Sequence, residues 1–256
     1  MSLLDIDFYS DVLGRNQRME VILPPGPAPE GGFPTLYLLH GMTDDCTIWL
    51  RRSSIERYAD ARKLAVVMPD GMLGWYADAR AGERYFSFVS EELPALALRM
   101  LPGLAQTRAR RFVGGLSMGG YGALSCALRR PELFSRAISL SGALDAAALP
   151  GLDRGQAGAR FWADRFGPAE AISGSENDLF RAAEICPGPR PAVWMWCGTE
   201  DFLYEMNLRM RDHLQKLGYA LDYSECPGEH DWPHWDREIQ RALDWLPLGG
   251  EGAQWP

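Results

Sequence analysis

The sequence has little of what marks a nucleic-acid-binding or membrane-spanning protein. Basic residues are in the minority, with 26 Lys and Arg against 34 Asp and Glu, and the formal net charge is −8. A nucleic-acid partner would need a basic patch, and this balance argues against one. No apolar run approaches the roughly 20 residues of a transmembrane helix. We therefore expect neither a nucleic-acid partner nor a membrane partner.

Cysteine and metal-ligand patterns are also sparse. The five cysteines are scattered, odd in number and without Cys-x-x-Cys spacing, which favours free thiols in a reducing compartment over a disulfide framework or a zinc site. No cluster of His, Asp and Glu has metal-ligand spacing, so no metal is expected. The start, Met-Ser-Leu-Leu-Asp, lacks the basic residues and the apolar run of a signal peptide. We expect a cytoplasmic protein.

Enough apolar sequence is present for one large domain. With 256 residues, 46% of them hydrophobic, the chain can bury a full core. Segments typical of strands alternate with helical segments, which predicts βαβ units: an α/β fold with a mostly parallel sheet and helices on both faces. The first two strands are expected to add an antiparallel edge. The expected strands are residues 3–9, 17–23, 35–39, 65–70, 134–140, 192–198, 220–226 and one that begins at Arg111.

The domain is expected to cover residues 1–247. Within it, residues 143–190 have scattered Gly and Pro, and we expect them to form an irregular insertion over the face that bears the reactive groups. Residues 248–256 are expected to be a flexible tail. The helical patterns lie at 49–64, 91–101, 202–217 and 235–246, with one more directly after Ser117.

Ser117 lies at the centre of a strand–turn–helix pattern, Arg-Phe-Val-Gly-Gly-Leu-Ser-Met-Gly-Gly. A nucleophile elbow has this form, because its serine sits on a sharp, strained turn. Gly115 and Gly119 fit that turn, since side chains there would collide with neighbouring backbone. The helix N-terminus after the serine favours developing negative charge. The alternative is an ordinary Gly-rich turn.

A base and an orienting acid follow the ends of two later strands. Parallel strands present their carboxyl ends at one edge of the sheet, so these groups are expected to meet Ser117 there. His230 would take the proton of the serine hydroxyl, and Asp201 would orient the imidazole. The order serine, acid, histidine is that of the α/β-hydrolases. Glu200 is the alternative acid, and a helix N-cap is the alternative role for Asp201.

The other three histidines have other expected roles. His40 would shape a loop, His213 would be structural within a helix, and His234 lies near the start of the last helix. Two backbone N–H groups would form an oxyanion hole. The residues expected to supply them are Met118 and Met42, with Gly41 as the alternative to Met42.

Three aromatic residues follow strand ends and are candidates for a substrate pocket. Trp49, Trp75 and Tyr76 would line the acyl or alcohol side, and plain core packing is the alternative. Cys46 is either a reactive thiol near the site or a packed free cysteine, and packing is the commoner role of a free cysteine.

Six short sequence blocks carry a resemblance to a known family. They are His-Gly-Met at 40–42, Trp-Leu-Arg at 49–51, Gly-Trp-Tyr-Ala-Asp at 74–78, Glu-Glu-Leu-Pro at 91–94, Gly-Leu-Ser-Met-Gly-Gly at 115–120 and Gly-Glu-His-Asp-Trp at 228–232. In this order the blocks resemble the esterase D family. The resemblance implies an α/β-hydrolase fold, the triad Ser117, Asp201 and His230, no cofactor, and hydrolysis of short-chain acyl esters from acetyl to butyryl. Within the family the pattern is most similar to small cytoplasmic tributyrin or acetyl esterases. Such esterases often self-associate, which makes a homo-oligomer possible, but the sequence does not indicate the oligomeric state.

Two alternatives use the same residues differently. An acyltransferase, or a thioesterase of the S-formylglutathione type, would form the same acyl-enzyme. The loop of residues 40–46 departs from the S-formylglutathione hydrolase pattern. A non-catalytic binding protein of the same fold is the third possibility, and loss of a triad member would be its signature.

Overall fold

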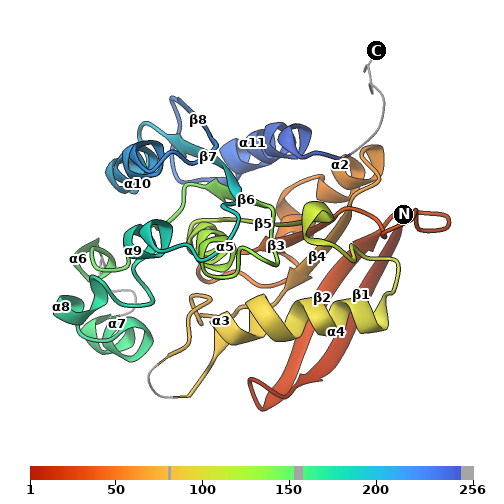
Figure 1. The fold of residues 1–256 in the computed structure, drawn as a ribbon, viewed down its shortest axis with the longest axis horizontal. Helices are drawn as coiled ribbons and strands as arrows, with labels where there is room; N and C mark the ends of the chain where they lie inside the picture. The colour runs from red at the N-terminus through yellow and green to blue at the C-terminus, as the bar shows by residue number, and fades with distance from the viewer. Residues whose placement is uncertain (80–81, 153–157, 249–256) are drawn as a thin grey trace.

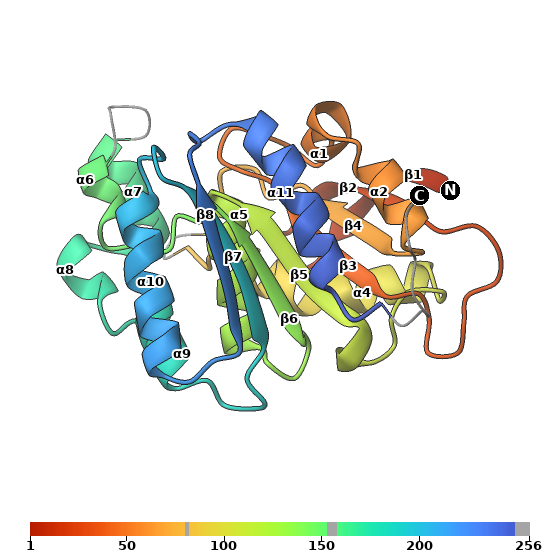
Figure 2. The same ribbon diagram turned by 90° about the horizontal axis from the view of Figure 1, so that it is seen from above.

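Eight strands form one sheet in the part of the chain that the structure, a computed structural model, describes: residues 1–79, 82–152 and 158–248. Their order across the sheet is β1-β2-β4-β3-β5-β6-β7-β8 (Figures 1 and 2). The strands are β1 (Ser2–Ser10), β2 (Arg15–Leu23), β3 (Thr35–Leu39), β4 (Ala65–Pro69), β5 (Arg111–Leu116), β6 (Arg136–Leu140), β7 (Ala192–Gly198) and β8 (Leu221–Cys226).

Six of these strands, from β4 to β8 across the sheet, run parallel. β2 pairs antiparallel with both β1 and β4, so the antiparallel edge lies at the N-terminal strands as predicted. Every residue of β3, β4 and β5 is buried, which explains why these strands read as continuous apolar runs in the sequence. The predicted mixed α/β sheet is confirmed.

Helices cover both faces of the sheet. One face packs against α1 (Ile48–Arg52), α2 (Ile55–Ala61) and α11 (Trp232–Trp245), and the other packs against α3 (Tyr85–Ser87), α4 (Leu93–Met100), α5 (Met118–Arg129), α9 (Leu179–Glu184) and α10 (Tyr204–Lys216). Figure 1 shows α2 and α11 on the opposite side of the sheet from α3 and α4. Each face therefore has its own apolar core.

Two predicted helices have different boundaries in the structure. The helical pattern at 49–64 is divided at Ser53, whose Oγ donates to the Trp49 carbonyl and accepts from the Ile55 N–H. A serine side chain that bonds the backbone in this way ends one helix and starts the next. The pattern at 91–101 begins earlier, at α3, and reaches α4 through a π-helical turn (Phe88–Glu92). Met100, the last residue of α4, is 40% exposed.

Residues 143–152 and 158–190 form short helices rather than sheet. They are α6 (Leu149–Leu152), α7 (Gly158–Phe166), α8 (Ala169–Ile172) and α9, which group beside α10 in both views (Figures 1 and 2). Buried apolar side chains from all four helices join the core on the α5 face. The predicted tail lies outside the described residues from 249 onward.

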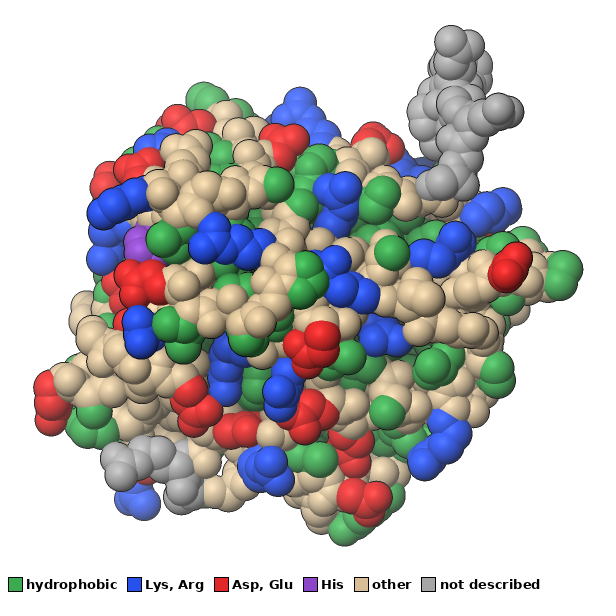
Figure 3. Space-filling view, viewed as in Figure 1, with side chains coloured by type: hydrophobic (Ala, Val, Ile, Leu, Met, Phe, Trp, Pro, Cys, Tyr) green, Lys and Arg blue, Asp and Glu red, His purple; other side chains and the backbone are tan. Residues whose placement is uncertain are grey.

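The surface carries charges of both signs. On the face shown in Figure 3, Lys and Arg side chains are interspersed with Asp and Glu. Among the described helices, none combines the length and the apolar character needed to cross a bilayer.

Candidate active site

Ser117 occupies a strained turn between β5 and α5. Its φ of 52° and ψ of −115° lie outside the regions that side chains favour. A Cβ on Gly115 would lie 2.5 Å from the Gly119 carbonyl carbon, and one on Gly119 would lie 2.5 Å from the Leu39 carbonyl oxygen. Both glycines are therefore required sterically, as the sequence predicted. The turn leaves the Ser117 side chain at the C-terminal edge of the sheet, at the N-terminus of α5.

His230 links Ser117 to Asp201. Its Nε2 is 3.0 Å from Ser117 Oγ, and its Nδ1 is 2.8 Å from Asp201 Oδ2. The Asp201 side chain is fully buried, while that of His230 is 18% exposed. An imidazole held between a carboxylate and a hydroxyl can accept the hydroxyl proton, because the carboxylate fixes its tautomer and stabilises the cation that forms.

The two alternative acids have separate contacts. Asp201 uses Oδ2 for His230, whereas its Oδ1 accepts the Leu203 N–H at 2.8 Å. Asp201 is not the N-cap of α10, because that position is held by Leu203 and no side chain caps the helix there. The Glu200 carboxylate accepts the Gly228 N–H instead, and the Glu200 N–H donates to the Gly228 carbonyl at 3.0 Å.

Two aromatic rings enclose the His230 imidazole. The Phe202 ring lies 4.6 Å from it between centroids, and the Trp235 ring meets it edge-on at 4.8 Å. The Trp235 indole N–H donates to Ser141 Oγ at 3.1 Å, which fixes the indole. Neither ring was among the predicted site residues. Phe202 could have been found from its position directly after the acid, but Trp235 reads as an ordinary core residue of its helix.

A cavity of about 320 Å³ opens beside Ser117 and His230. Its polar rim includes Thr43 and Asp44, and apolar side chains form most of the remaining wall. Those apolar residues are Met42, Trp75, Leu116, Ala143, Leu149, Leu152, Trp162, Phe202, Leu203 and Trp235. A larger hollow of about 660 Å³ lies at the opposite ends of β6, β7 and β8, away from Ser117.

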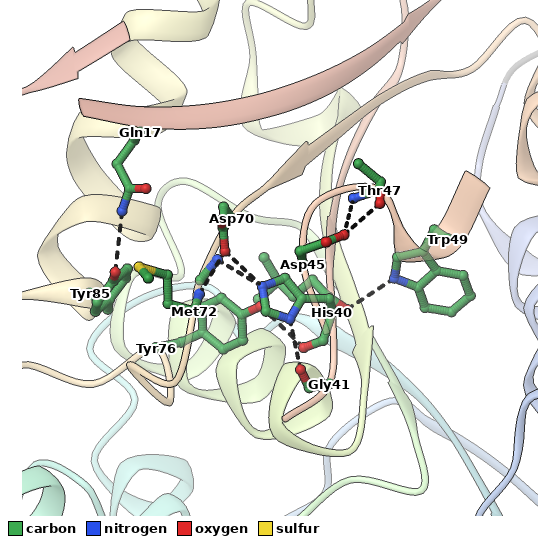
Figure 4. Close-up of polar contacts among 12 residues, drawn as sticks. Gln17, His40, Gly41, Asp45, Thr47, Trp49, Asp70, Met72, Tyr76 and Tyr85 are labelled. Atoms are coloured by element: carbon green, nitrogen blue, oxygen red, sulfur yellow. Dashed lines mark hydrogen bonds and ion pairs between the residues drawn. The ribbon is translucent and has the colours of Figure 1, made fainter. Parts of the chain in front are cut away.

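Of the three predicted pocket aromatics, the structure places only Trp75 on the cavity wall. The prediction is wrong for Trp49 and Tyr76, which have no exposed surface. Trp49 donates its indole N–H to the Leu39 carbonyl, and Tyr76 donates its hydroxyl to the His40 carbonyl (Figure 4). Both residues do follow strand ends, but their side chains point into the protein rather than into the cavity.

Gly41 and Met42 lie along the cavity beside Ser117. A Cβ on Gly41 would lie 3.8 Å from Ser117 Cβ. Met118 is the first residue of α5, so its N–H belongs to the group that a helix leaves without an intrahelical partner. Gly41, the alternative donor, therefore lies beside the serine, Met118 directly follows it, and Met42 lines the same cavity.

The remaining histidines lie elsewhere. His213 on α10 contacts the Phe180 carbonyl at 3.0 Å through Nε2, and His234 on α11 contacts Asp231 at 2.5 Å through Nδ1. His40 is buried in the loop after β3, where a loop-shaping role was expected. Among the described residues, no group of three or more His, Cys, Asp or Glu is arranged to hold a metal ion.

Burial changes the pKa of two groups in the segment between β3 and α1. It raises the pKa of the Asp44 carboxyl, although His40 and the Gly41 N–H partly oppose this. Burial likewise raises the pKa of the Cys46 thiol to about 12. All five cysteines are free, and Cys46 is packed, which favours the inert alternative for it.

The fold and the serine turn define an α/β-hydrolase, and comparisons with known proteins identify its family. Residues 10–246 match the family model described as "Putative esterase". The chain belongs to this esterase family and is a serine esterase.

Individual relatives extend over nearly the whole chain. An acetyl esterase from Caldicellulosiruptor saccharolyticus is 32% identical over 263 residues, covering 96% of this chain and 98% of the relative. FphF, a fluorophosphonate-binding serine hydrolase of Staphylococcus aureus, has a TM-score of 0.89 and 30% identity, covering 97% of this chain and 99% of its own. An S-formylglutathione hydrolase from Staphylococcus aureus has a TM-score of 0.85 and 30% identity, covering 96% and 98%.

Proposed function

We propose that Ser117, His230 and Asp201 form the catalytic triad of a carboxylesterase for short-chain acyl esters. The observation that carries this is the continuous chain of contacts from Ser117 Oγ through His230 to Asp201, at 3.0 and 2.8 Å. The backbone N–H groups of Met42 and Met118 would bind the oxyanion, and loss of one such donor typically raises the barrier by about 3 kcal/mol.

The reaction would proceed in two halves. Ser117 Oγ attacks the ester carbonyl carbon while its proton passes to His230 Nε2, which gives a tetrahedral intermediate. The bond to the alcohol oxygen breaks as His230 returns the proton to that oxygen, leaving an acyl-enzyme. Water then adds to the acyl carbonyl, its proton passing to His230, and the acid departs as Ser117 Oγ recovers the proton.

The cavity supports a short acyl chain. Its volume of about 320 Å³ is at the small end of ligand pockets. Leu149, Leu152 and Trp162 line the cavity, so residues 143–152 and 158–190 would act as the insertion that covers the active site. The acetyl esterase relative is consistent with this substrate class. We also propose that the chain belongs to the esterase D group and forms a single domain over residues 1–247. Its proposed location is the cytoplasm.

The direct test is Ser117→Ala assayed with p-nitrophenyl acetate. Loss of a serine nucleophile costs about six orders of magnitude in kcat where it has been measured. The variant should keep the wild-type circular dichroism spectrum and melting temperature. Hydrolysis retained within tenfold of wild type would refute the assignment.

Thioester hydrolysis by the same site is a second candidate, favoured by the similarity to an S-formylglutathione hydrolase. A panel of matched acetyl esters and acetyl thioesters, compared by kcat/KM, separates the two. Adding alcohols to the same assays and measuring transesterified product distinguishes acyl transfer from hydrolysis. A thioester preferred over its matched ester by more than tenfold would reverse the order of the two candidates.

A further inference from the structure

Three successive backbone carbonyls at the end of β3 each meet a buried side-chain donor (Figure 4). The indole N–H of Trp49 donates to the Leu39 carbonyl at 3.1 Å, and the Tyr76 hydroxyl donates to the His40 carbonyl at 3.1 Å. The Gly41 carbonyl oxygen lies 2.7 Å from His40 Nδ1. The chain is thus held at three consecutive peptides immediately before Met42.

The partners of His40 determine which ring nitrogen carries the proton. Nε2 accepts the Gly71 N–H at 2.8 Å, so in the neutral ring the hydrogen lies on Nδ1. Nδ1–H therefore donates to the Gly41 carbonyl.

We propose that His40, Tyr76 and Trp49 are positioning residues that orient the oxyanion-hole peptide between Gly41 and Met42. In a trans peptide the carbonyl and the N–H point in opposite directions. Fixing the Gly41 carbonyl on the His40 side therefore fixes the Met42 N–H on the other side. This inference rests on the proposed function, in which that N–H binds the oxyanion.

The backbone around Tyr76 is strained in a way that plain core packing does not require. Trp75 and Tyr76 have φ values of 56° and 49°, a region that costs side-chain-bearing residues free energy. The Tyr76 ring fills space that a Cβ on Gly71 or Gly122 would need, at 2.4 and 2.5 Å. Strain of this kind persists only where the surroundings over-determine the conformation. In this strained conformation the Tyr76 hydroxyl reaches the His40 carbonyl and donates to it.

Tyr76→Phe is the first test, because it removes only the hydroxyl. Tyr219→Phe is the matched control: its buried hydroxyl also donates to a backbone carbonyl, that of Ala183 at 2.7 Å, away from this loop. For p-nitrophenyl acetate, kcat and kcat/KM of Tyr76→Phe should fall about 3- to 10-fold, since one hydrogen bond is lost. KM should change less than about twofold, as expected for a contact that acts in the transition state.

A tetrahedral inhibitor separates positioning from general stability. Trifluoroacetone forms a hemiketal with an active serine, and the resulting oxyanion occupies the hole. Its inhibition constant should rise in Tyr76→Phe by the same factor by which kcat/KM falls, and should not change in Tyr219→Phe. Equal activity and inhibition in the two variants would overturn the proposal, whatever their melting temperatures.

His40 is tested by a pair of substitutions. The amide nitrogen of Asn can take the place of Nδ1, whereas Leu offers no donor. We expect His40→Leu to lower kcat/KM about 100-fold, the range for one lost oxyanion donor, and His40→Asn to recover at least tenfold of that loss. A folded His40→Asn no better than His40→Leu contradicts the proposal.

Failure of the proposal can be told apart from failure of the proposed function. If Ser117→Ala is inactive but Tyr76→Phe matches Tyr219→Phe, the triad stands and the positioning role falls. If Ser117→Ala retains activity, both fall.

Discussion

Glu200 and Gly228 hold each other by two hydrogen bonds. The Gly228 N–H donates to the Glu200 carboxylate, and the Glu200 N–H donates to the Gly228 carbonyl at 3.0 Å. Glu200 directly precedes Asp201, and Gly228 lies two residues before His230. This pair therefore fixes the spacing of the two loops that carry the acid and the base.

The Glu200 contact predicts a pH-dependent contribution to stability. The Gly228 N–H is the main cause of a lowered pKa for the Glu200 carboxyl. A folded-state pKa below the unfolded value gives stabilisation that is present at neutral pH and is lost as the pH falls through the folded value. Glu200→Gln should thus melt at a lower temperature than wild type at pH 7, with the gap closing in acid. Melting curves across this range, with exposed Glu170→Gln as control, measure it; a gap that widens in acid contradicts the assignment.

Asp201 is predicted to matter far more for catalysis than Glu200. Asp201→Asn keeps the size of the side chain but alters the tautomer of His230, which typically lowers kcat by about four orders of magnitude. Glu200→Gln should lower it only a few-fold, through loop position. Steady-state kinetics on folded variants, with exposed Asp212→Asn as control, give the ranking. The reverse order would make Glu200 the acid.

Trp162 is predicted to limit acyl-chain length. It lines the cavity and packs edge-on against Trp75 at 5.0 Å between ring centroids. Wild type should turn over butyrate faster than palmitate. Trp162→Leu should raise the octanoate-to-acetate ratio of kcat/KM at least about tenfold, because room for a methylene group is worth that much in a tight pocket. Trp245→Leu on α11 controls for a lost indole, and an unchanged ratio would exclude Trp162 from the acyl wall.

Cys46 and Cys126 are predicted to resist alkylation in the native protein. Burial raises the pKa of both thiols to about 12, against 9.0 for an ordinary cysteine. A raised thiol pKa lowers the thiolate fraction, and the thiolate is the reactive form. Iodoacetamide at pH 8 should label Cys186 and Cys226 first, with all five labelled in urea, as mass spectrometry can show. Rapid labelling of Cys46 with loss of activity would mark it as the reactive thiol.

Local sequence determined the elements and the serine turn. Continuous apolar runs predicted the buried parallel strands, because a strand covered on both faces has no polar side. The need for Gly115 and Gly119 was also readable, since close backbone approach within a tight turn is a local property. The order of Ser117, Asp201 and His230 along the chain indicated residues that the structure brings within hydrogen-bond distance.

The directions of side chains in loops could not be predicted from the local sequence. Trp49 and Tyr76 follow strand ends as a pocket residue would, yet both point inward to backbone carbonyls. The choice depends on which carbonyls lie nearby once the chain has folded, and a buried donor must find one of them.

The sequence by itself determined an α/β sheet, a strained serine and the chain order of its partners, because these follow from apolar periodicity and local sterics. Only the tertiary structure decided which aromatic side chains face the cavity and which hold the loop after β3. It also decided that Phe202 and Trp235 enclose His230. These are contacts between segments far apart in sequence, and their geometry is set by packing rather than by any local pattern.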